Sequence, residues 1–385
     1  MRIYRVAILG CRGRGTAAGR AYHAHPRTEV VGLCDLIPER LETLGVELGV
    51  SARFADLDAM IREVAPDIVA IPTGTEFHYD LCMRVLEHGA HIDVEKPFCV
   101  DLVQADAVIR RAAEAGVRVA VHHQGRTGAA LQTVARAVKE GKIGALRHVI
   151  ASGKGYYGGY GLMNIGTHLL NGMLECTGHC KRVTASALTD GHPIAPEDAL
   201  PSPGGMGTIA GEHITATLAF EGNVTATLLQ HRFPVVDSAA YGMEIRGSEG
   251  RLFWKSGGAW WMRTPHFAPG DGASRWEALD LVYPAHYDAA MSAAADDYMY
   301  ADDFVRALDE GREHTCSGTE GRHVLEIMMG IFESAAFGRP VTLPQADRQH
   351  PLLRWRREAG LDAPDSMPRS YGEWLEAEDR RLHRK

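Results

Sequence analysis

The chain has 385 residues, of which 45% are hydrophobic and 23% charged, and its formal net charge is −8 at pH 7. This length exceeds one ordinary core and favours two or three globular domains. The negative charge argues against nucleic acid or an anionic membrane as a partner, because both require clustered Lys and Arg. We also expect no signal peptide and no transmembrane segment, since no apolar stretch approaches twenty residues.

Short apolar runs alternate with helical periodicity between residues 6 and 122. The runs lack an alternation of polar and apolar residues, which indicates strands buried on both faces of a parallel sheet with helices on either side. Gly89 and Gly116 stand where left-handed cap residues end two of the helices. We therefore predict a doubly wound Rossmann domain over residues 1–122, with strands at 6–9, 30–33, 68–71, 91–94 and 117–121.

The pattern changes after residue 124 to long alternating strands, at 213–220 and 224–229 and in a hairpin of 243–246 with 251–254. Such alternation predicts one covered and one open face, so we expect residues 123–344 to form an α/β domain with a large open, mostly antiparallel sheet. Helices are expected near 296–311 and 319–337. Residues 345–385, rich in Arg, Glu and Pro, are predicted to be an arm that is solvated or contacts another subunit.

Seven cysteines form no even disulfide framework, so we expect reduced thiols and a cytoplasmic location. The spacing Cys176-x-x-His179-Cys180 suggests zinc, but no second ligand cluster accompanies it in the sequence. We therefore predict no metal site.

A glycine-rich run follows the first predicted strand and opens a helix: Gly10-Cys11-Arg12-Gly13-Arg14-Gly15. In this context the helix amides and dipole hold a pyrophosphate. Asp35 ends the second strand, where its carboxylate accepts the ribose hydroxyls and repels a 2′-phosphate, so NAD is favoured over NADP. Arg12 occupies the position of the usual middle glycine. Either Gly13 shifts the turn to compensate, or Arg12 points towards the phosphates.

Glu95-Lys96-Pro97 closes the strand at 91–94, at the carboxyl end where ligand and chemistry lie in a doubly wound domain. Two further segments carry motifs. The segment Pro72-Thr73-Gly74 with His78 lies before Glu95, and the run 164–171, preceded by Gly158-Gly159, lies after Pro97. Taken together over residues 4–344, these motifs resemble the Gfo/Idh/MocA oxidoreductase family, named for glucose-fructose oxidoreductase and inositol dehydrogenase.

The resemblance implies a Rossmann domain that binds NAD and a second domain whose open sheet forms subunit contacts, in a homodimer or homotetramer. It also implies a carbohydrate or cyclitol as substrate. The residues expected at the cofactor are Gly10, Arg12, Gly13, Arg14, Gly15, Asp35, Thr73, His78, Glu95, Lys96 and Gln124.

The family's catalytic lysine and histidine correspond to Lys96 and His168, whereas both family aspartates are replaced, by Asn164 and Asn171. In an α-helix Asn164, His168 and Asn171 share one face. We expect His168 to take the hydroxyl proton and Lys96 to polarise the same oxygen, while Asn164, which cannot accept a proton, orients the substrate or His168.

Three tyrosines before this helix, Tyr156, Tyr157 and Tyr160, and Asn171 within it are expected at the substrate, although packing in a loop is an equal alternative for the tyrosines.

The leading functional prediction is an NAD-dependent dehydrogenase that oxidises a secondary alcohol of a sugar, sugar derivative or cyclitol. The first alternative is an enzyme that cleaves glycosides with tightly bound NAD, by transient oxidation and elimination, as a branch resembling this family does. The second is a non-catalytic NAD-binding protein. Stoichiometric release of NADH supports the first prediction, turnover without net NADH supports cleavage, and the absence of any turnover supports the non-catalytic protein.

Overall fold

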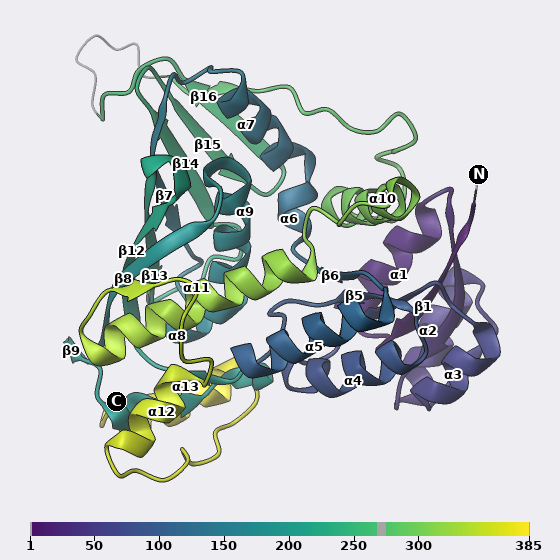
Figure 1. Ribbon diagram of the computed structural model, residues 1–385, viewed down its shortest axis with the longest axis horizontal. Helices are drawn as coiled ribbons and strands as arrows, with labels where there is room; N and C mark the ends of the chain where they lie inside the picture. The colour runs from purple at the N-terminus through teal and green to yellow at the C-terminus, as the bar shows by residue number, and fades with distance from the viewer. Residues whose placement is uncertain (1, 268–274, 385) are drawn as a thin grey trace. The chain divides into compact units, whose positions relative to one another are not determined.

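The computed structural model describes residues 2–267 and 275–384, and the chain divides into two compact units (Figure 1). Unit 1 comprises Met1–Cys99, Gln104–Ala129 and Tyr283–Arg322; unit 2 comprises Val100–Val103, Ala130–Val282 and His323–Lys385. The segment Tyr283–Arg322 thus returns to the first unit, whereas the sequence pattern assigned it to the second domain.

Unit 1 contains the predicted parallel sheet, with six strands in the order β3-β2-β1-β4-β5-β6. Their bounds are β1 Tyr4–Leu9, β2 Thr28–Cys34, β3 Arg53–Phe54, β4 Ile68–Ile71, β5 His91–Val94 and β6 Val119–Val121. Every pairing within the sheet is parallel, and the chain reverses its direction of travel across the sheet between β1 and β4. In an open α/β sheet this reversal marks the crevice where ligands bind, at the carboxyl ends of the strands.

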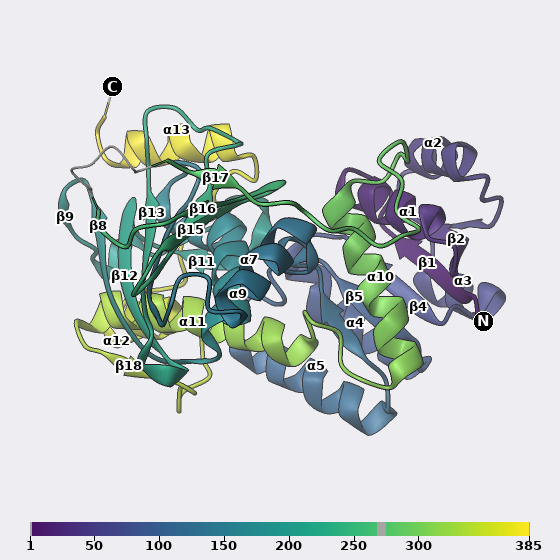
Figure 2. The same cartoon turned by 90° about the horizontal axis from the view of Figure 1, so that it is seen from above.

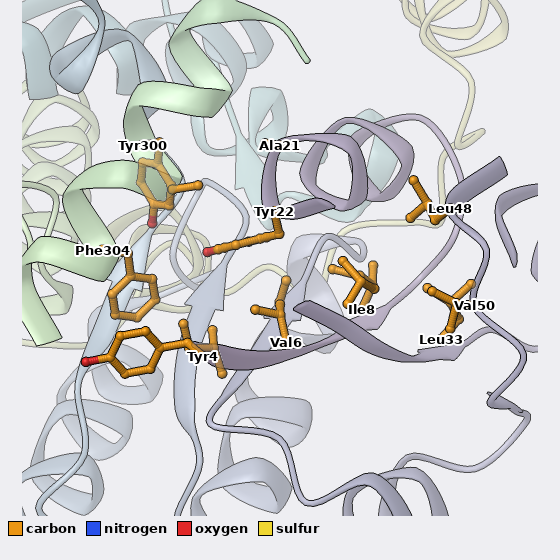
Figure 3. Close-up of a cluster of buried hydrophobic side chains, with 14 of the residues drawn as sticks. Tyr4, Val6, Ile8, Ala21, Tyr22, Leu33, Leu48, Val50, Tyr300 and Phe304 are labelled. Atoms are coloured by element: carbon orange, nitrogen blue, oxygen red, sulfur yellow. The ribbon is translucent and has the colours of Figure 1, made fainter. Parts of the chain in front are cut away.

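The helices of this unit are α1 Arg14–Ala24, α2 Pro38–Leu48, α3 Leu57–Val64, α4 Thr75–Glu87, α5 Leu102–Ala115, α6 Gln124–Thr127 and α10 Ala295–Glu310. Figure 3 shows why α10 belongs here: Tyr300 and Phe304 lie in the same buried cluster as Tyr4 and Tyr22. All four side chains are at most 4% exposed. Burial of these large rings removes apolar surface from water and so fastens α10 to the Rossmann sheet.

Unit 2 is built on a ten-stranded sheet in the order β17-β16-β15-β14-β7-β13-β12-β8-β18, with β9 paired to β8. Only the β7–β13 pairing is parallel, so the predicted large, mostly antiparallel sheet is confirmed. The strands are β7 Leu146–Ser152, β8 Cys180–Thr189, β9 His192–Pro193, β12 His213–Phe220, β13 Thr225–His231, β14 Gly242–Gly247, β15 Arg251–Lys255, β16 Gly258–Met262, β17 Glu277–Ala278 and β18 Val341–Thr342. A separate pair joins β10 Leu200–Pro201 to β11 Thr208–Ile209.

The helices of unit 2 are α7 Ala129–Lys139, α8 Gly158–Gly161, the π-helical turn η1 Leu162–Gly166, α9 Thr167–Thr177, α12 Pro351–Glu358, α13 Tyr371–Arg381 and, from His323 on, α11 Gly318–Phe337. Figure 2 shows α9 alongside the strands of the large sheet. Three short 3₁₀ turns lie at Pro196–Asp198, Pro203–Gly205 and Glu221–Asn223.

The C-terminal segment packs within unit 2 and is therefore not a solvated arm, while the predicted contact with another subunit stays a prediction. Trp374 of α13 is fully buried, and its indole N–H donates to the carbonyl of Pro201 at 2.7 Å. The basic residues find buried carboxylates within the unit: Arg384 binds Glu212 at 2.7 Å, and Arg381 binds Glu378 at 2.7 Å. These partners lie far away in sequence or inside the segment itself, and composition alone does not reveal them.

Among the described residues, every helix is too short or too polar to cross a lipid bilayer.

Candidate functional site

The turn between β1 and α1 has the close backbone packing that a dinucleotide requires. Gly10 adopts φ +107°, and a Cβ atom on Gly15 would lie 1.8 Å from the Gly10 carbonyl oxygen, so neither position accepts a larger residue. Gly13 precedes α1 with φ +50°, while the side chain of Arg12 is exposed. No side chain caps α1. Although the Gly15 amide donates to the Arg12 carbonyl at 2.9 Å, the positive dipole end of α1 is not capped by a side chain and remains available to an anion.

Asp35 follows β2 and lies beside this turn. Its carboxylate oxygens accept the amides of Cys11 at 2.8 Å and Ile37 at 2.9 Å, and Arg40 lies 3.7 Å away. Each oxygen retains a second lone pair for a hydroxyl group. Asp35 therefore fixes the glycine turn as well as offering acceptors to a ribose, a role that its place in the sequence did not indicate.

Thr73 lies against the other side of the turn, where its methyl group would be 3.5 Å from a Cβ atom on Gly10. Its hydroxyl oxygen is buried and has no hydrogen-bond partner among the described residues. A buried hydroxyl without a partner is costly. The uncapped helix, the glycine contacts, Asp35 and this hydroxyl together fit a bound dinucleotide.

His78 is completely buried in α4. Its Nδ1 lies 3.0 Å from the Pro97 carbonyl oxygen, and its Nε2 lies 3.2 Å from that of Thr73. Burial lowers the pKa of His78, which favours a neutral ring. His78 thus bridges the loop after β4 and the turn that contains Lys96, so the structure gives it a supporting position in the predicted cofactor site.

Glu95 and Lys96 follow β5 at the carboxyl edge of the sheet. One oxygen of the buried Glu95 accepts the Lys96 amide at 3.1 Å, and the other accepts Arg14 Nε at 2.6 Å. Arg14 is the first residue of α1, directly after the glycine turn. The Arg14 guanidinium therefore connects the glycine turn before α1 to the turn that contains Lys96. Arg14 was predicted to contact the cofactor, but its side chain binds carboxylates of the protein.

A buried network of charges extends from Arg14 into the unit. Arg14 Nη2 binds Asp297 of α10 at 2.7 Å, and His122 lies between Asp297 at 3.1 Å and Asp93 at 3.0 Å. Burial opposes a charged imidazole, but the attraction of Asp93 and the hydrogen bonds of both aspartates outweigh it and raise the pKa of His122 to about 10. Tyr22 adds a hydrogen bond to Asp93 at 2.9 Å.

Sequence reasoning named His122 and His123 as alternatives for lining the nicotinamide pocket, but it missed Asp93 and Asp297 as parts of this site. Asp297 lies 283 residues from Arg14 in the chain, so no local pattern connects them. The available signal was an aspartate inside an otherwise apolar strand, since a buried carboxylate requires partners.

His122 and His123 directly follow β6, and both are buried. His123 is buried, and burial followed by the positive charge of Lys96 holds the pKa of His123 well below its usual range. A neutral imidazole therefore lies within electrostatic reach of Lys96, which adds His123 to the candidate site. Gln124 begins α6 next to it and is partly exposed.

In unit 2, α8, η1 and α9 follow one another without a break, and Asn164 falls inside the π-helical turn. A π turn contains more residues than an α turn, so the predicted α-helical spacing from Asn164 to His168 was wrong. His168 is partly exposed, but Asn171 is fully buried. The three side chains therefore do not form one uniform polar face. Asn164 instead hydrogen-bonds the hydroxyl of Tyr160.

The tyrosines before this helix fall into two groups. Tyr156 and Tyr160 are partly exposed and pack with Tyr371 of α13, with ring centroids 5.0 and 4.8 Å from that of Tyr371. Burial, with smaller contributions from Tyr156 and Tyr371, raises the pKa of Tyr160 to about 12. Tyr157 is fully buried against Trp374, and its hydroxyl donates to Glu378 at 3.2 Å. We therefore retain Tyr156 and Tyr160 as substrate candidates and assign Tyr157 a packing role.

The glycines that lead into the helix allow it to contact the backbone of the large sheet. The amides of Gly158 and Gly159 donate to the carbonyls of Glu212 at 2.9 Å and Gly211 at 2.8 Å. A Cβ atom on Gly158 would lie 2.6 Å from the carbonyl oxygen of Gln230. Only glycine permits this approach, which holds Tyr160 and Asn164 against the sheet.

Comparison with known proteins gives a consistent picture. Residues 4–123 match the model of an oxidoreductase family with an NAD-binding Rossmann fold, GFO_IDH_MocA. The chain is similar to D-apiose dehydrogenase of Paraburkholderia graminis, with 25% identity over 375 residues, 91% of this chain and 92% of that protein.

Two further similarities are more limited. A solved structure of levoglucosan dehydrogenase with NADH and levoglucosan has a TM-score of 0.73 at 18% identity, and covers 89% of this chain and 100% of that one, which shows a shared fold. A glycosyl hydrolase family 109 protein of Bacteroides thetaiotaomicron is 31% identical over only 107 residues, 26% of this chain and 23% of that protein.

Proposed function

The chain belongs to the Gfo/Idh/MocA oxidoreductases and uses NAD as cofactor, and from this premise we propose that it is a dehydrogenase of a sugar, a sugar derivative or a cyclitol. The observation that carries the proposal is the fixed position of Lys96. It follows β5 at the edge where the nucleotide turn opens, and its amide is held by Glu95, which Arg14 holds in turn. Similarity to D-apiose dehydrogenase across 91% of the chain supports a carbohydrate substrate.

NAD, when bound, accepts the hydride from the carbinol carbon of the substrate. We assign the cradle of the dinucleotide to the α1 amides, Asp35 and Thr73. Lys96 polarises the reacting hydroxyl oxygen, and the neutral His123 beside Lys96 adds no competing positive charge. His168 accepts the hydroxyl proton, because imidazole titrates near neutrality.

The substrate residues of unit 2 are proposed to be Tyr156, Tyr160 and Asn164. Aromatic faces and a phenolic hydroxyl suit a sugar, which presents C–H groups on its faces and hydroxyls at its rim. Asn164 already binds the Tyr160 hydroxyl, so it orients that group or the substrate rather than accepting a proton.

The direct test is a panel of sugars, sugar acids and cyclitols with NAD, followed by NADH absorbance. We expect stoichiometric NADH with at least one of them. Lys96→Ala and His168→Ala should each lower kcat by roughly two orders of magnitude. Exposed residues of the same types serve as controls, and Lys139→Ala and His192→Ala should retain wild-type activity.

Glycoside cleavage with bound NAD is the second candidate, supported by the two asparagines at the usual aspartate positions and by the match to the family 109 protein. Release of sugar from a glycoside without net NADH would favour it over the dehydrogenase. If no compound in either class turns over while NAD binds, the proposal of an active enzyme fails.

We further propose a cytoplasmic homodimer or homotetramer assembled through the open face of the large sheet. Thr184 and Thr217 are exposed there and lie opposite one another, with Thr227 across the next strand. β-branched hydroxyl side chains form a flat surface able to pack on its own copy. Light scattering of Thr217→Lys against the wild type tests this, since a buried lysine at a symmetric contact should yield monomers.

A further inference from the structure

Three metal-binding side chains converge in unit 1 away from Lys96. His25 directly follows α1, Asp302 lies in α10, and His286 precedes α10 in the chain. One donor atom of each residue lies within 4.8 Å of the other two. Asp302 Oδ1 is 3.3 Å from the Nε2 atoms of both histidines.

These distances suit one small cation. Zinc binds imidazole nitrogen and carboxylate oxygen at about 2.0–2.2 Å, so the ligands of a tetrahedral zinc ion lie roughly 3.4 Å apart. The two distances from Asp302 already have this value. The third separation, between the two imidazole nitrogens, is at most 4.8 Å, and the side chain of His286, which is 44% exposed, has room to move.

Tyr298 sets the orientation of His286. The tyrosine hydroxyl donates to the carbonyl of His286 at 3.2 Å, so it accepts the 2.7 Å hydrogen bond from His286 Nδ1. A neutral ring with its proton on Nδ1 directs the lone pair of Nε2 towards Asp302 Oδ1. A cation between Nε2 and Oδ1, which lie 3.3 Å apart, would bind the lone pairs of both atoms. A hydrogen bond on the remote nitrogen is the usual companion of a histidine ligand.

Asp302 and His25 are also held by neighbouring groups. Arg306 Nε binds Asp302 Oδ2 at 2.9 Å, which leaves Oδ1 for the two imidazoles. His25 is 2% exposed, and its Nδ1 accepts the Arg27 amide at 3.2 Å. The His25 proton then lies on Nε2 in the metal-free protein. Metal binding moves it to Nδ1 and gives up that long hydrogen bond, while the exposed side of His286 leaves positions for water.

We propose that His25, His286 and Asp302 form a binding site for a first-row transition metal ion, with Zn²⁺ as its natural class of occupant. Two imidazoles and one carboxylate favour such ions over Mg²⁺, which prefers oxygen ligands. The site joins the end of α1 to α10 and to the segment before it. An ion bound only by the folded protein stabilises that fold, so the metal would stabilise the packing of Tyr283–Arg322 within unit 1.

The test uses the full chain after treatment with a chelator. Equilibrium dialysis against Zn²⁺, with metal analysis, should show one more equivalent bound by the wild type than by His286→Ala, and Zn²⁺ should raise the Tm of the wild type only. His286 is exposed, so this variant should fold. His23→Ala removes an exposed histidine of α1 and should bind like the wild type.

Tyr298→Phe removes the hydroxyl that orients His286 and should weaken Zn²⁺ binding by roughly tenfold to a hundredfold. Mg²⁺ at the same concentration should not compete. Equal Zn²⁺ stoichiometry and affinity in the wild type and His286→Ala would overturn the proposal, as would a Tm rise of the same size in both proteins.

Discussion

Asp297→Asn should destabilise unit 1 in a pH-dependent way, because Asp297 is the carboxylate shared by Arg14 and His122. Asparagine has the same shape and keeps an oxygen for Arg14, but it removes the negative charge. Loss of one partner from a buried ion pair costs about 3–5 kcal/mol, and the retained hydrogen bond places the expected loss near 3 kcal/mol. Asp309, which lies on the same helix and pairs with Arg27 nearer the surface, offers a control, since Asp309→Asn should cost less than about 1 kcal/mol.

The pH dependence follows from the titration of His122. An unfolded histidine titrates near pH 6.5, whereas the pKa of His122 is about 10 in the folded protein. Its contribution is complete below about pH 6.5 and is lost as the pH rises towards 10, by up to about 1.4 kcal/mol per pH unit. Asp297→Asn lowers the folded pKa of His122. The difference in unfolding free energy between the wild type and the variant should therefore shrink as the pH rises from 6.5 to 9.5.

Hydrogen exchange measures this effect locally, at amides of β5 and β6, after correction for the intrinsic exchange rate at each pH. All six tryptophans lie in unit 2, so their fluorescence reports the unfolding of the other unit and should be unchanged by the substitution. An equal loss of protection in Asp297→Asn and Asp309→Asn, or a difference that stays constant with pH, would refute the charged network.

Three further predictions concern other parts of the molecule. NAD should bind at least tenfold more tightly than NADP in a fluorescence titration, because Asp35 repels a 2′-phosphate, and reversed affinities would remove Asp35 from the adenosine site. Asn164→Asp should leave the acidic limb of the kcat/KM profile at the same pH, because the π-helical turn takes Asn164 off the α-helical spacing to His168 and Tyr160 engages it; a limb that moves to higher pH with intact NAD binding would place the two residues side by side. Trp374→Ala should lower the unfolding free energy of unit 2 by about 3–5 kcal/mol in urea titrations, whereas Leu353→Ala at an exposed site of α12 should have almost no effect, and equal effects would contradict the packed C-terminal segment.

The hydrophobic periodicity of the sequence was sufficient to predict the strands and helices in which apolar residues recur regularly. The predicted strands at 6–9, 68–71 and 91–94 correspond to β1, β4 and β5, and the helices predicted near 296–311 and 319–337 correspond to α10 and α11. Buried parallel strands and the glycine turn have local signatures, because burial on both faces and backbone crowding each constrain residue type. The strand β3 was missed because two residues carry no period.

The remaining differences arise from long-range contacts. α10 has the pattern of any amphipathic helix, and its place in unit 1 depends on Tyr300 and Phe304 meeting the cluster around Tyr4. The C-terminal segment has the composition of a solvated arm, yet Trp374 and the buried Glu378 hold it in unit 2. In both cases the decisive partner lies far away in sequence, so hydrophobic period and charge count alone predict a helix but not the surface it covers.

The π-helical turn shows how such a difference bears on chemistry. From sequence, Asn164 and His168 are four residues apart on an α-helix, which predicts side chains stacked on one face. In the structure Gly158 lies close to the carbonyls of Glu212 and Gln230, and the helix contains a π turn at Leu162–Gly166, which holds one residue more than an α turn. Asn164 is thereby turned to the Tyr160 hydroxyl. A neutral amide at this position can donate to the phenol oxygen and still accept from a substrate hydroxyl, whereas a carboxylate could only accept.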